Sequence, residues 1–239
     1  MNLISWTPTI FSRKGFLRDD SGRAYLPKNV FTDAITSAVI FYYIKKNKDI
    51  ENRVKRYLLR DELDIKKVAK DVKNIVLEKY PVLENLELPE KVYLEDKDIK
   101  IEYVEVFDLK EWIDTKGFKT EIFTGTVEIP ISSPYIEKLK SATHSYAEAL
   151  ARIEYSFLKE HPLGELFYKP LINDLKKWEL PLRIGLWTEV SFKGDLLFFW
   201  KIKEVREKLL KTLKIDIKPR YVLYIPRLKQ TTGWIELKN

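Results

Sequence analysis

Residues 91–157 decide the fold class, because the hydrophobic period changes within them from two to nearly four. Residues 91–96 (KVYLED), 100–109 (KIEYVEVFDL) and 119–131 (KTEIFTGTVEIPI) alternate apolar with polar side chains and are rich in β-branched and aromatic residues, which is typical of strands. After Ser133 and Pro134, apolar residues recur at steps of three and four as far as Phe157, which predicts one long helix. Strands and helix therefore follow one another here.

The segments before residue 91 repeat this mixture. Residues 2–11 are expected to form a strand, which Pro8 limits to a sheet edge or ends early. Apolar residues at helical spacing predict a helix over residues 30–43, with Asn29 as its N-cap. Residues 45–88 form a charged helical region, which we interpret as an insertion because the strand pattern is the same on both sides of it.

The segment after residue 157 contains short elements and ends in a predicted hairpin. Residues 221–226 (YVLYIP) and 233–237 (GWIEL) are its expected strands, joined by the loop RLKQTT. Strands and helices are mixed without a regular βαβ alternation, and no fixed repeat is present. The sequence therefore predicts an α+β fold.

Composition excludes several classes of protein. The chain has 239 residues and no cysteine, so disulfides and cysteine–zinc sites are impossible. No apolar run reaches the roughly 18 residues that span a bilayer, and residues 1–10 lack the basic start of a signal peptide, so we expect a cytoplasmic protein without a membrane partner. The sequence has no nucleotide-binding glycine loop and no zinc-protease or calcium-loop motif. We expect no metal and no small-molecule cofactor.

His144 is the one candidate for acid–base catalysis. It shares a helical stripe with Glu148 at i+4 and Arg152 at i+8, an arrangement that could tune its protonation and hold a phosphate. A solvated polar helix face explains the same pattern and is the preferred interpretation, so no catalytic residue is assigned.

Basic loops near both chain ends are candidates for nucleic-acid binding. The net charge is +7, which favours polyanions as partners. Cations lie beside glycine and aromatic residues in these loops, a combination that suits single-stranded RNA, because charge meets phosphate and rings stack on bases. Solvated loops beside core aromatics would look the same, so both interpretations stay open. The candidates are Arg13, Lys14, Arg18, Lys193, Arg227 and Lys229.

Two segments carry a resemblance to a known family. Tyr25-Leu26-Pro27, followed by a helix containing Val30-Phe31 and Ala34-Ile35, resembles the (I/L)PGSSLKGAIR segment of CRISPR-associated RAMP proteins. Residues 182–185 (LRIG), together with the Pro226 to Gly233-Trp234 ending, resemble the glycine-bearing strand and the C-terminus of the type III-A RAMP subunit that caps the 3′ end of the guide RNA. Lys28 and Asn29 stand where the family has glycine and serine, and they could hold a phosphate at the helix N-terminus. Arg183 lies within the second motif and joins the candidate RNA ligands.

The resemblance implies a ferredoxin-like (RRM-like) fold with a helical insertion at about residues 45–90, and leaves a duplication open. Residues 1–239 would form one RAMP-like unit, with an N-terminal half over 1–131 and a C-terminal half over 132–239. The implied function is a non-catalytic RNA-binding and assembly subunit of a type III CRISPR ribonucleoprotein in antiviral defence. Its expected partners are CRISPR RNA and other effector subunits.

Two alternatives remain. One is a metal-independent endoribonuclease of the related repeat-cleaving family, with His144 as general base. The other is a protein–protein scaffold without RNA contact, which would use aromatic helix faces around Tyr42, Tyr43 and Trp200.

Overall fold

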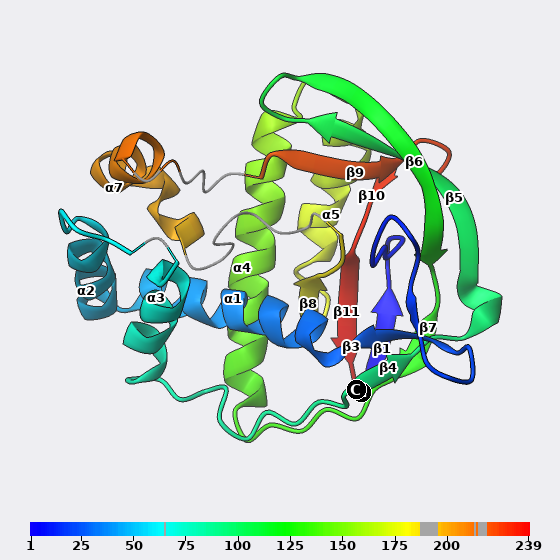
Figure 1. Cartoon of the computed structure of the whole chain (residues 1–239), viewed down its shortest axis with the longest axis horizontal. Helices are drawn as coiled ribbons and strands as arrows, with labels where there is room; N and C mark the ends of the chain where they lie inside the picture. The colour runs from blue at the N-terminus through cyan, green and yellow to red at the C-terminus, as the bar shows by residue number, and fades with distance from the viewer. Residues whose placement is uncertain (65, 187–195, 213, 215–218) are drawn as a thin grey trace.

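A computed structural model describes residues 1–64, 66–186, 196–212, 214 and 219–239, and shows an α+β fold with three antiparallel sheets (Figure 1). The α+β class expected from the sequence is confirmed. The α-helices of the described part are α1 (Lys28–Lys46), α2 (Lys48–Leu58), α3 (Val68–Leu77), α4 (Ile136–Phe157), α5 (Lys169–Asp174) and α7 (Lys203–Glu207). The strands are β1 (Asn2–Ser5), β2 (Leu17–Arg18), β3 (Ala24–Pro27), β4 (Lys91–Tyr93), β5 (Ile99–Asp108), β6 (Ile113–Phe123), β7 (Thr126–Glu128), β8 (Leu180–Arg183), β9 (Tyr221–Ile225), β10 (Gln230–Thr231) and β11 (Trp234–Lys238).

The central sheet joins the two ends of the chain. Its strand order is β7-β1-β11-β8, and β1 pairs with β11 so that Leu3 lies opposite Leu237. Leu3, Ile235 and Leu237 are fully buried in a core that also includes residues of α1 and α4. The sheet therefore depends on residues that are distant in sequence.

The second sheet is built on a long hairpin. Its order is β10-β9-β5-β6, and β5 and β6 pair from Ile99 and Phe123 to Asp108 and Ile113. The register shifts between Val104 and Val106, which marks a bulge, and the hairpin curves along one side of the molecule (Figure 1). The hairpin thus supplies an extended support for the loops that lie against it.

The third sheet, β2-β3-β4, leads directly into α1, and α2 and α3 pack on α1. α1 crosses α4, while α2, α3 and α7 lie together at the end of the molecule away from β5 and β6 (Figure 1). α2 and α3 fall inside the segment that we interpreted as an insertion. The division into halves at residue 131 remains a prediction, and β1 and β7 of the first half share a sheet with β8 and β11 of the second.

Three local predictions are wrong. β9 and β11 are not the two strands of one hairpin: β9 pairs with β10 and β5, whereas β11 pairs with β1 and β8, because the chain changes sheets at Thr232 and Gly233. Asn29 does not cap α1, since the helix begins at Lys28 behind Pro27 and no side chain caps it. The first strand ends at Ser5, and Thr9 makes only an isolated bridge to Phe123.

Candidate nucleic-acid interface

The N-terminal basic loop lies against β6. The guanidinium carbon of Arg13 lies 5.0 Å from the ring centroid of Phe118, and Lys14 is exposed. Arg18 Nη2 lies 2.6 Å from Oε1 of Glu121, whose other carboxylate oxygen accepts a 2.9 Å hydrogen bond from the amide of Phe16. Gly15 has a φ of +97°, and a Cβ there would lie 2.4 Å from Glu121 Oε2, so this close approach requires glycine. One carboxylate therefore fixes the loop and also neutralises Arg18.

The C-terminal basic loop lies against β5. Arg227 Nη2 donates to Oε1 of Glu102, and Lys229 is exposed with a φ of +53°. Beside this ion pair is a hollow of about 390 Å³, which Trp6 and Lys100 also line. Trp6 is 48% exposed and stacks on Trp178 with ring centroids 5.4 Å apart. This hollow combines cations with an accessible aromatic ring.

The two loops meet the same hairpin, on strands that pair with each other. Glu102 lies opposite Thr120, whereas Glu121 lies opposite Ile101, so the two carboxylates point to opposite faces of the hairpin. By the same alternation Phe118 shares its face with Glu102. The structure thus brings Arg13 and Arg227 to one face and places Arg18 on the other.

The remaining predicted residues do not join this group. Lys28 Nζ lies 2.8 Å from Glu90 Oε1, and the Lys28 amide donates to the Glu90 carbonyl oxygen at 3.0 Å, so Glu90 occupies both groups at the start of α1. Asn29 is exposed on the first turn of α1. Lys193 lies outside the described residues.

Arg183, which we predicted to bind RNA, is buried. Its side chain is 2% exposed, its Nη1 donates to Glu154 Oε1, and its Nε donates to the carbonyl oxygen of Thr232 at 3.3 Å. Tyr168 donates to the other oxygen of Glu154 at 2.8 Å, and burial raises the pKa of Tyr168, which keeps the phenol protonated. This network ties α4 to β8 and to the segment between β10 and β11, so Arg183 has a structural role.

Gly185, the glycine of the same motif, is required by the local packing. Gly185 has a φ of +102°, and a Cβ there would lie 2.3 Å from the carbonyl oxygen of Ile10. That oxygen accepts a 2.7 Å hydrogen bond from the amide of Leu186. Residues 182–185 therefore secure the packing of β8 against the segment that follows β1.

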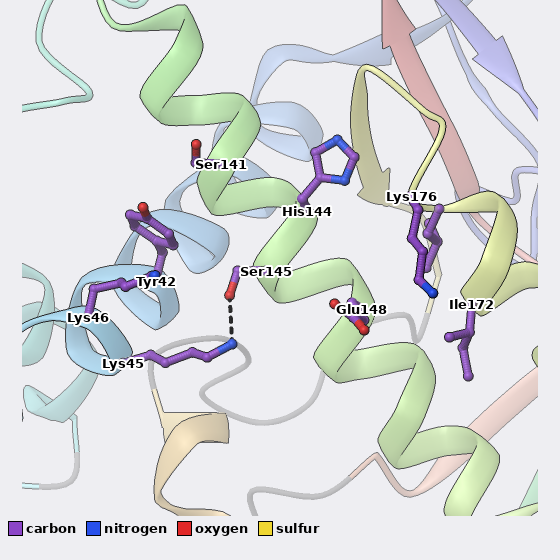
Figure 2. Close-up of a pocket in the computed structure, with 10 residues that line it drawn as sticks. Tyr42, Lys45, Lys46, Ser141, His144, Ser145, Glu148, Ile172 and Lys176 are labelled. Atoms are coloured by element: carbon purple, nitrogen blue, oxygen red, sulfur yellow. Dashed lines mark hydrogen bonds between the residues drawn. The ribbon is translucent and has the colours of Figure 1, made fainter.

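His144 lies in a second hollow of about 390 Å³, between α1, α4 and α5 (Figure 2). Arg152 Nε and Nη2 both donate to Glu148 Oε1, at 2.9 and 2.7 Å, so Arg152 binds the carboxylate that we expected to tune His144. In the described part of the chain no hydrogen bond to the His144 imidazole occurs. The predicted stripe exists, but Glu148 and Arg152 act as an ion pair beside His144.

Sequence reasoning missed the lysines of this hollow. Lys45 and Lys46 close α1, and Lys176 follows α5, so three cations from two elements surround the polar face of α4 (Figure 2). The Lys45-Lys46 pair in the sequence was the available signal, but it was interpreted only as the start of a charged helical region. Lys176 gave no such signal, because its proximity depends on the packing of α5.

His161 and one residue of the proposed aromatic surface, Tyr43, have structural roles. The His161 ring packs 4.9 Å from Phe107, and burial lowers the pKa of His161, although Asp114 acts in the opposite direction. Tyr43 is buried and stacks on Tyr80 at 4.0 Å, so it cannot serve an exposed interface. Within the described ranges no helix is long and apolar enough to cross a membrane, and no cluster of potential metal ligands occurs.

Comparisons with known proteins identify the fold. No family model matches the chain. An uncharacterized protein of Aquifex aeolicus is 40% identical over 241 residues, covering 100% of this chain and 99% of that protein. The crystal structure of T. onnurineus Csm5 superposes with a TM-score of 0.64 at 13% identity, covering 94% of this chain and 73% of Csm5. A chain of a Csm–crRNA–target RNA ternary complex from a type III-A CRISPR-Cas system gives 0.59 at 14% identity, covering 93% and 75%. The resemblance to the type III-A RAMP subunit is confirmed at the level of the fold.

Proposed function

The chain belongs to the same family as the Aquifex aeolicus protein and has the fold of Csm5, and from this premise we propose that it is a non-catalytic, RNA-binding subunit of a type III CRISPR effector. The RNA would be CRISPR RNA, and the other partners would be effector subunits in the cytoplasm. The observation that carries the proposal is the superposition of 94% of the chain on Csm5. A solved type III-A complex that contains crRNA and a chain of this fold supports the choice of partners.

The arrangement of the basic loops supports RNA binding at the hairpin. Arg13 and Arg227 share a face of β5 and β6, Lys14 and Lys229 are exposed beside them, and Trp6 offers a ring next to Arg227. Cations meet phosphates and rings stack on bases without selecting a sequence. Binding would therefore depend strongly on salt and weakly on base composition.

A filter-binding experiment tests this function with a quadruple charge reversal, in which Arg13, Lys14, Arg227 and Lys229 become glutamate. We expect affinity for CRISPR RNA and for unrelated single strands to fall by at least about tenfold at low salt, with a smaller salt dependence. The matched control reverses four lysines that already pair with carboxylates elsewhere: Lys48, Lys169, Lys177 and Lys203. Equal losses of affinity in both variants would mean that net charge alone explains the effect, and would reject the loop site.

A second candidate function, a metal-independent endoribonuclease, is favoured by one observation: His144 lies in a hollow with three lysines. Such an enzyme would use His144 as a general base and a lysine to stabilise the charge of the transition state. Incubation with repeat RNA in chelator separates the two functions. We expect intact RNA, and cleavage that His144→Gln abolishes would replace the non-catalytic proposal.

A further inference from the structure

The hollow between α1, α4 and α5, hereafter the helical hollow, differs from the chain-end loops in its charge balance. It is lined by Tyr42, Lys45, Lys46, Ser141, His144, Ser145, Glu148, Ile172, Leu175 and Lys176. We infer that the helical hollow is a second phosphate-binding site, which takes the phosphate groups of single-stranded RNA apart from the hairpin loops. The inference rests on the proposed function for RNA as the source of the phosphate, and on the geometry of the helical hollow for the site.

The lysines lie around a polar surface of α4, the floor of the helical hollow, which includes Ser141 and Ser145. α4 runs through the centre with Ser141 and Ser145 toward α1, and Lys176 lies on the other side near Ile172 (Figure 2). Lys45 Nζ donates to Ser145 Oγ at 3.1 Å, which holds the ammonium over the floor. Lys46 Nζ lies 5.9 Å from the centroid of the Tyr42 ring. Positive charge therefore reaches the helical hollow from both walls.

The charge of these lysines is not cancelled locally. Within the described ranges, Lys45, Lys46 and Lys176 form no ion pair, whereas Lys177, the neighbour of Lys176, lies 2.9 Å from Asp174. Among the described residues that line the hollow, Glu148 is the only acidic one, and Arg152 already binds it. The described part of the helical hollow thus presents an excess of hydrogen-bond donors to an anion.

The helix dipole of α1 explains only part of this arrangement. Lysines in the last turn of a helix interact favourably with the negative end of its dipole, which accounts for Lys45 and Lys46. Lys176 lies in the turn after α5 and gains nothing from the dipole of α1. Cations from α1 and from the turn after α5 can together donate charge-assisted hydrogen bonds to one phosphate, which are stronger than neutral ones.

The volume and the aromatic wall favour a nucleotide over a single free phosphate. A hollow of about 390 Å³ falls within the usual range for small-ligand sites, roughly 300–1,000 Å³. Tyr42 is half-buried on the wall, and a tyrosine ring can stack with any base. A phosphate held by the lysines would leave room for its sugar and base beside Tyr42.

The two histidines of the chain allow a direct test by NMR. His144 lies in the helical hollow, and His161 lies beyond the far end of α4, against Phe107. On titration with pyrophosphate and with a 5′-phosphorylated uridine dinucleotide, we expect the imidazole signals of His144 to shift and those of His161 to stay, with His144→Gln giving the assignment. No shift at His144, or equal shifts at both, would overturn the inference.

A matched pair of triple variants tests the same site with RNA. Lys45, Lys46 and Lys176 become glutamine in one variant, and Lys48, Lys169 and Lys177, all paired with carboxylates, become glutamine in the other. Both lose the same net charge. For an oligouridylate of about 12 nucleotides, we expect the hollow variant to bind about tenfold more weakly and to lose about 2 units of the salt slope, since each phosphate contact on a single strand contributes roughly 0.7. Equal affinities of the two variants would reject the site.

The choice of probes identifies the source of the phosphate. Oligouridylates with 5′-hydroxyl, 5′-phosphate and 3′-phosphate ends distinguish internal phosphodiesters, which give equal affinities, from a terminal phosphate, which gives a preference. Oligoglutamate of similar charge is the counter-test, because equal sensitivity to the hollow variant would indicate an acidic protein partner and overturn the inference. If phosphate shifts His144 but CRISPR RNA and effector subunits do not bind, the proposed function fails and the site remains.

Discussion

The hairpin loops and the helical hollow both carry clustered positive charge, and they differ in what lies beside each cation. At the hairpin, Arg18 pairs with Glu121 and Arg227 with Glu102. In the helical hollow the one carboxylate, Glu148, is bound by Arg152 instead of by a lysine of the lining. A paired arginine holds a loop in place, whereas an unpaired lysine offers its charge to a ligand. Net charge and motifs therefore identify the cations, but only their ion pairs in the structure show which cations are available to bind a ligand.

The largest effect is expected at the most completely paired cation, Arg183. Removal of one partner from a buried ion pair leaves an uncompensated charge, so Arg183→Ala should lower the free energy of unfolding by about 3–5 kcal/mol. Urea denaturation followed by tryptophan fluorescence measures this loss. Arg227→Ala is the control, since its pair is exposed and should contribute much less. If Arg183→Ala kept nearly wild-type stability but bound RNA more weakly, Arg183 would be an RNA ligand after all.

Removal of the carboxylates that pair with Arg227 and Arg18 should have an intermediate effect, on RNA affinity. In a Glu102→Gln, Glu121→Gln double variant, Arg227 loses its carboxylate and Arg18 keeps only that of Asp96, 3.9 Å away. A glutamine at 121 can still accept a hydrogen bond from the Phe16 amide. We expect RNA binding at low salt to tighten about three- to tenfold, because two more cations can replace counterions. Filter binding measures the change, with Glu90→Gln beside Lys28 as the comparison for a pair away from the hairpin. Unchanged affinity would mean that RNA does not reach these arginines.

A smaller effect on stability is expected at His161. Burial lowers the pKa of His161 below its ordinary value of 6.5, so the unfolded chain binds a proton more readily than the folded one. The stability that His161 contributes is therefore complete above about pH 6.5 and decreases as the pH falls toward the lowered pKa. Urea midpoints from pH 7.5 to about 5.5 should fall less in His161→Gln than in wild type. A flat wild-type profile would contradict the assignment of this pH dependence to His161.

The elements that sequence could predict are those with local causes. The period-two pattern predicted β5 and the end of β6, although the strand expected over 119–131 is divided between β6 and β7. The steps of three and four predicted α4. A half-buried strand and an amphipathic helix impose these periods. The terminal hairpin was mispredicted because YVLYI and WIELK have the composition of hairpin strands, yet their partners are β5 and β1. Pairing between distant strands leaves no local pattern.

The site was predictable only in part for the same reason. Loop cations near glycine and aromatic residues were visible in the sequence, and Arg13 and Arg227 do share a face of the hairpin. The carboxylates that pair with Arg227 and Arg18, Glu102 and Glu121, come from strands that lie 125 and 103 residues away along the chain. The burial of Arg183 depends on Glu154 and Thr232, which lie 29 and 49 residues away along the chain. The sequence shows which residues are charged, but only the fold shows which of these charges are neutralised by a partner.

The pairing of β1 with β11 also determines when the molecule can fold during its synthesis. Residues 2–5 are synthesised long before their partners at 235–238, so the central sheet cannot close until β11 has left the ribosome. Until then, β1 has an unpaired edge and Leu3 an exposed side chain that other chains can contact. Slow closure of such distant pairs is expected, and a nascent chain of this kind would benefit from a chaperone that shields its first strand.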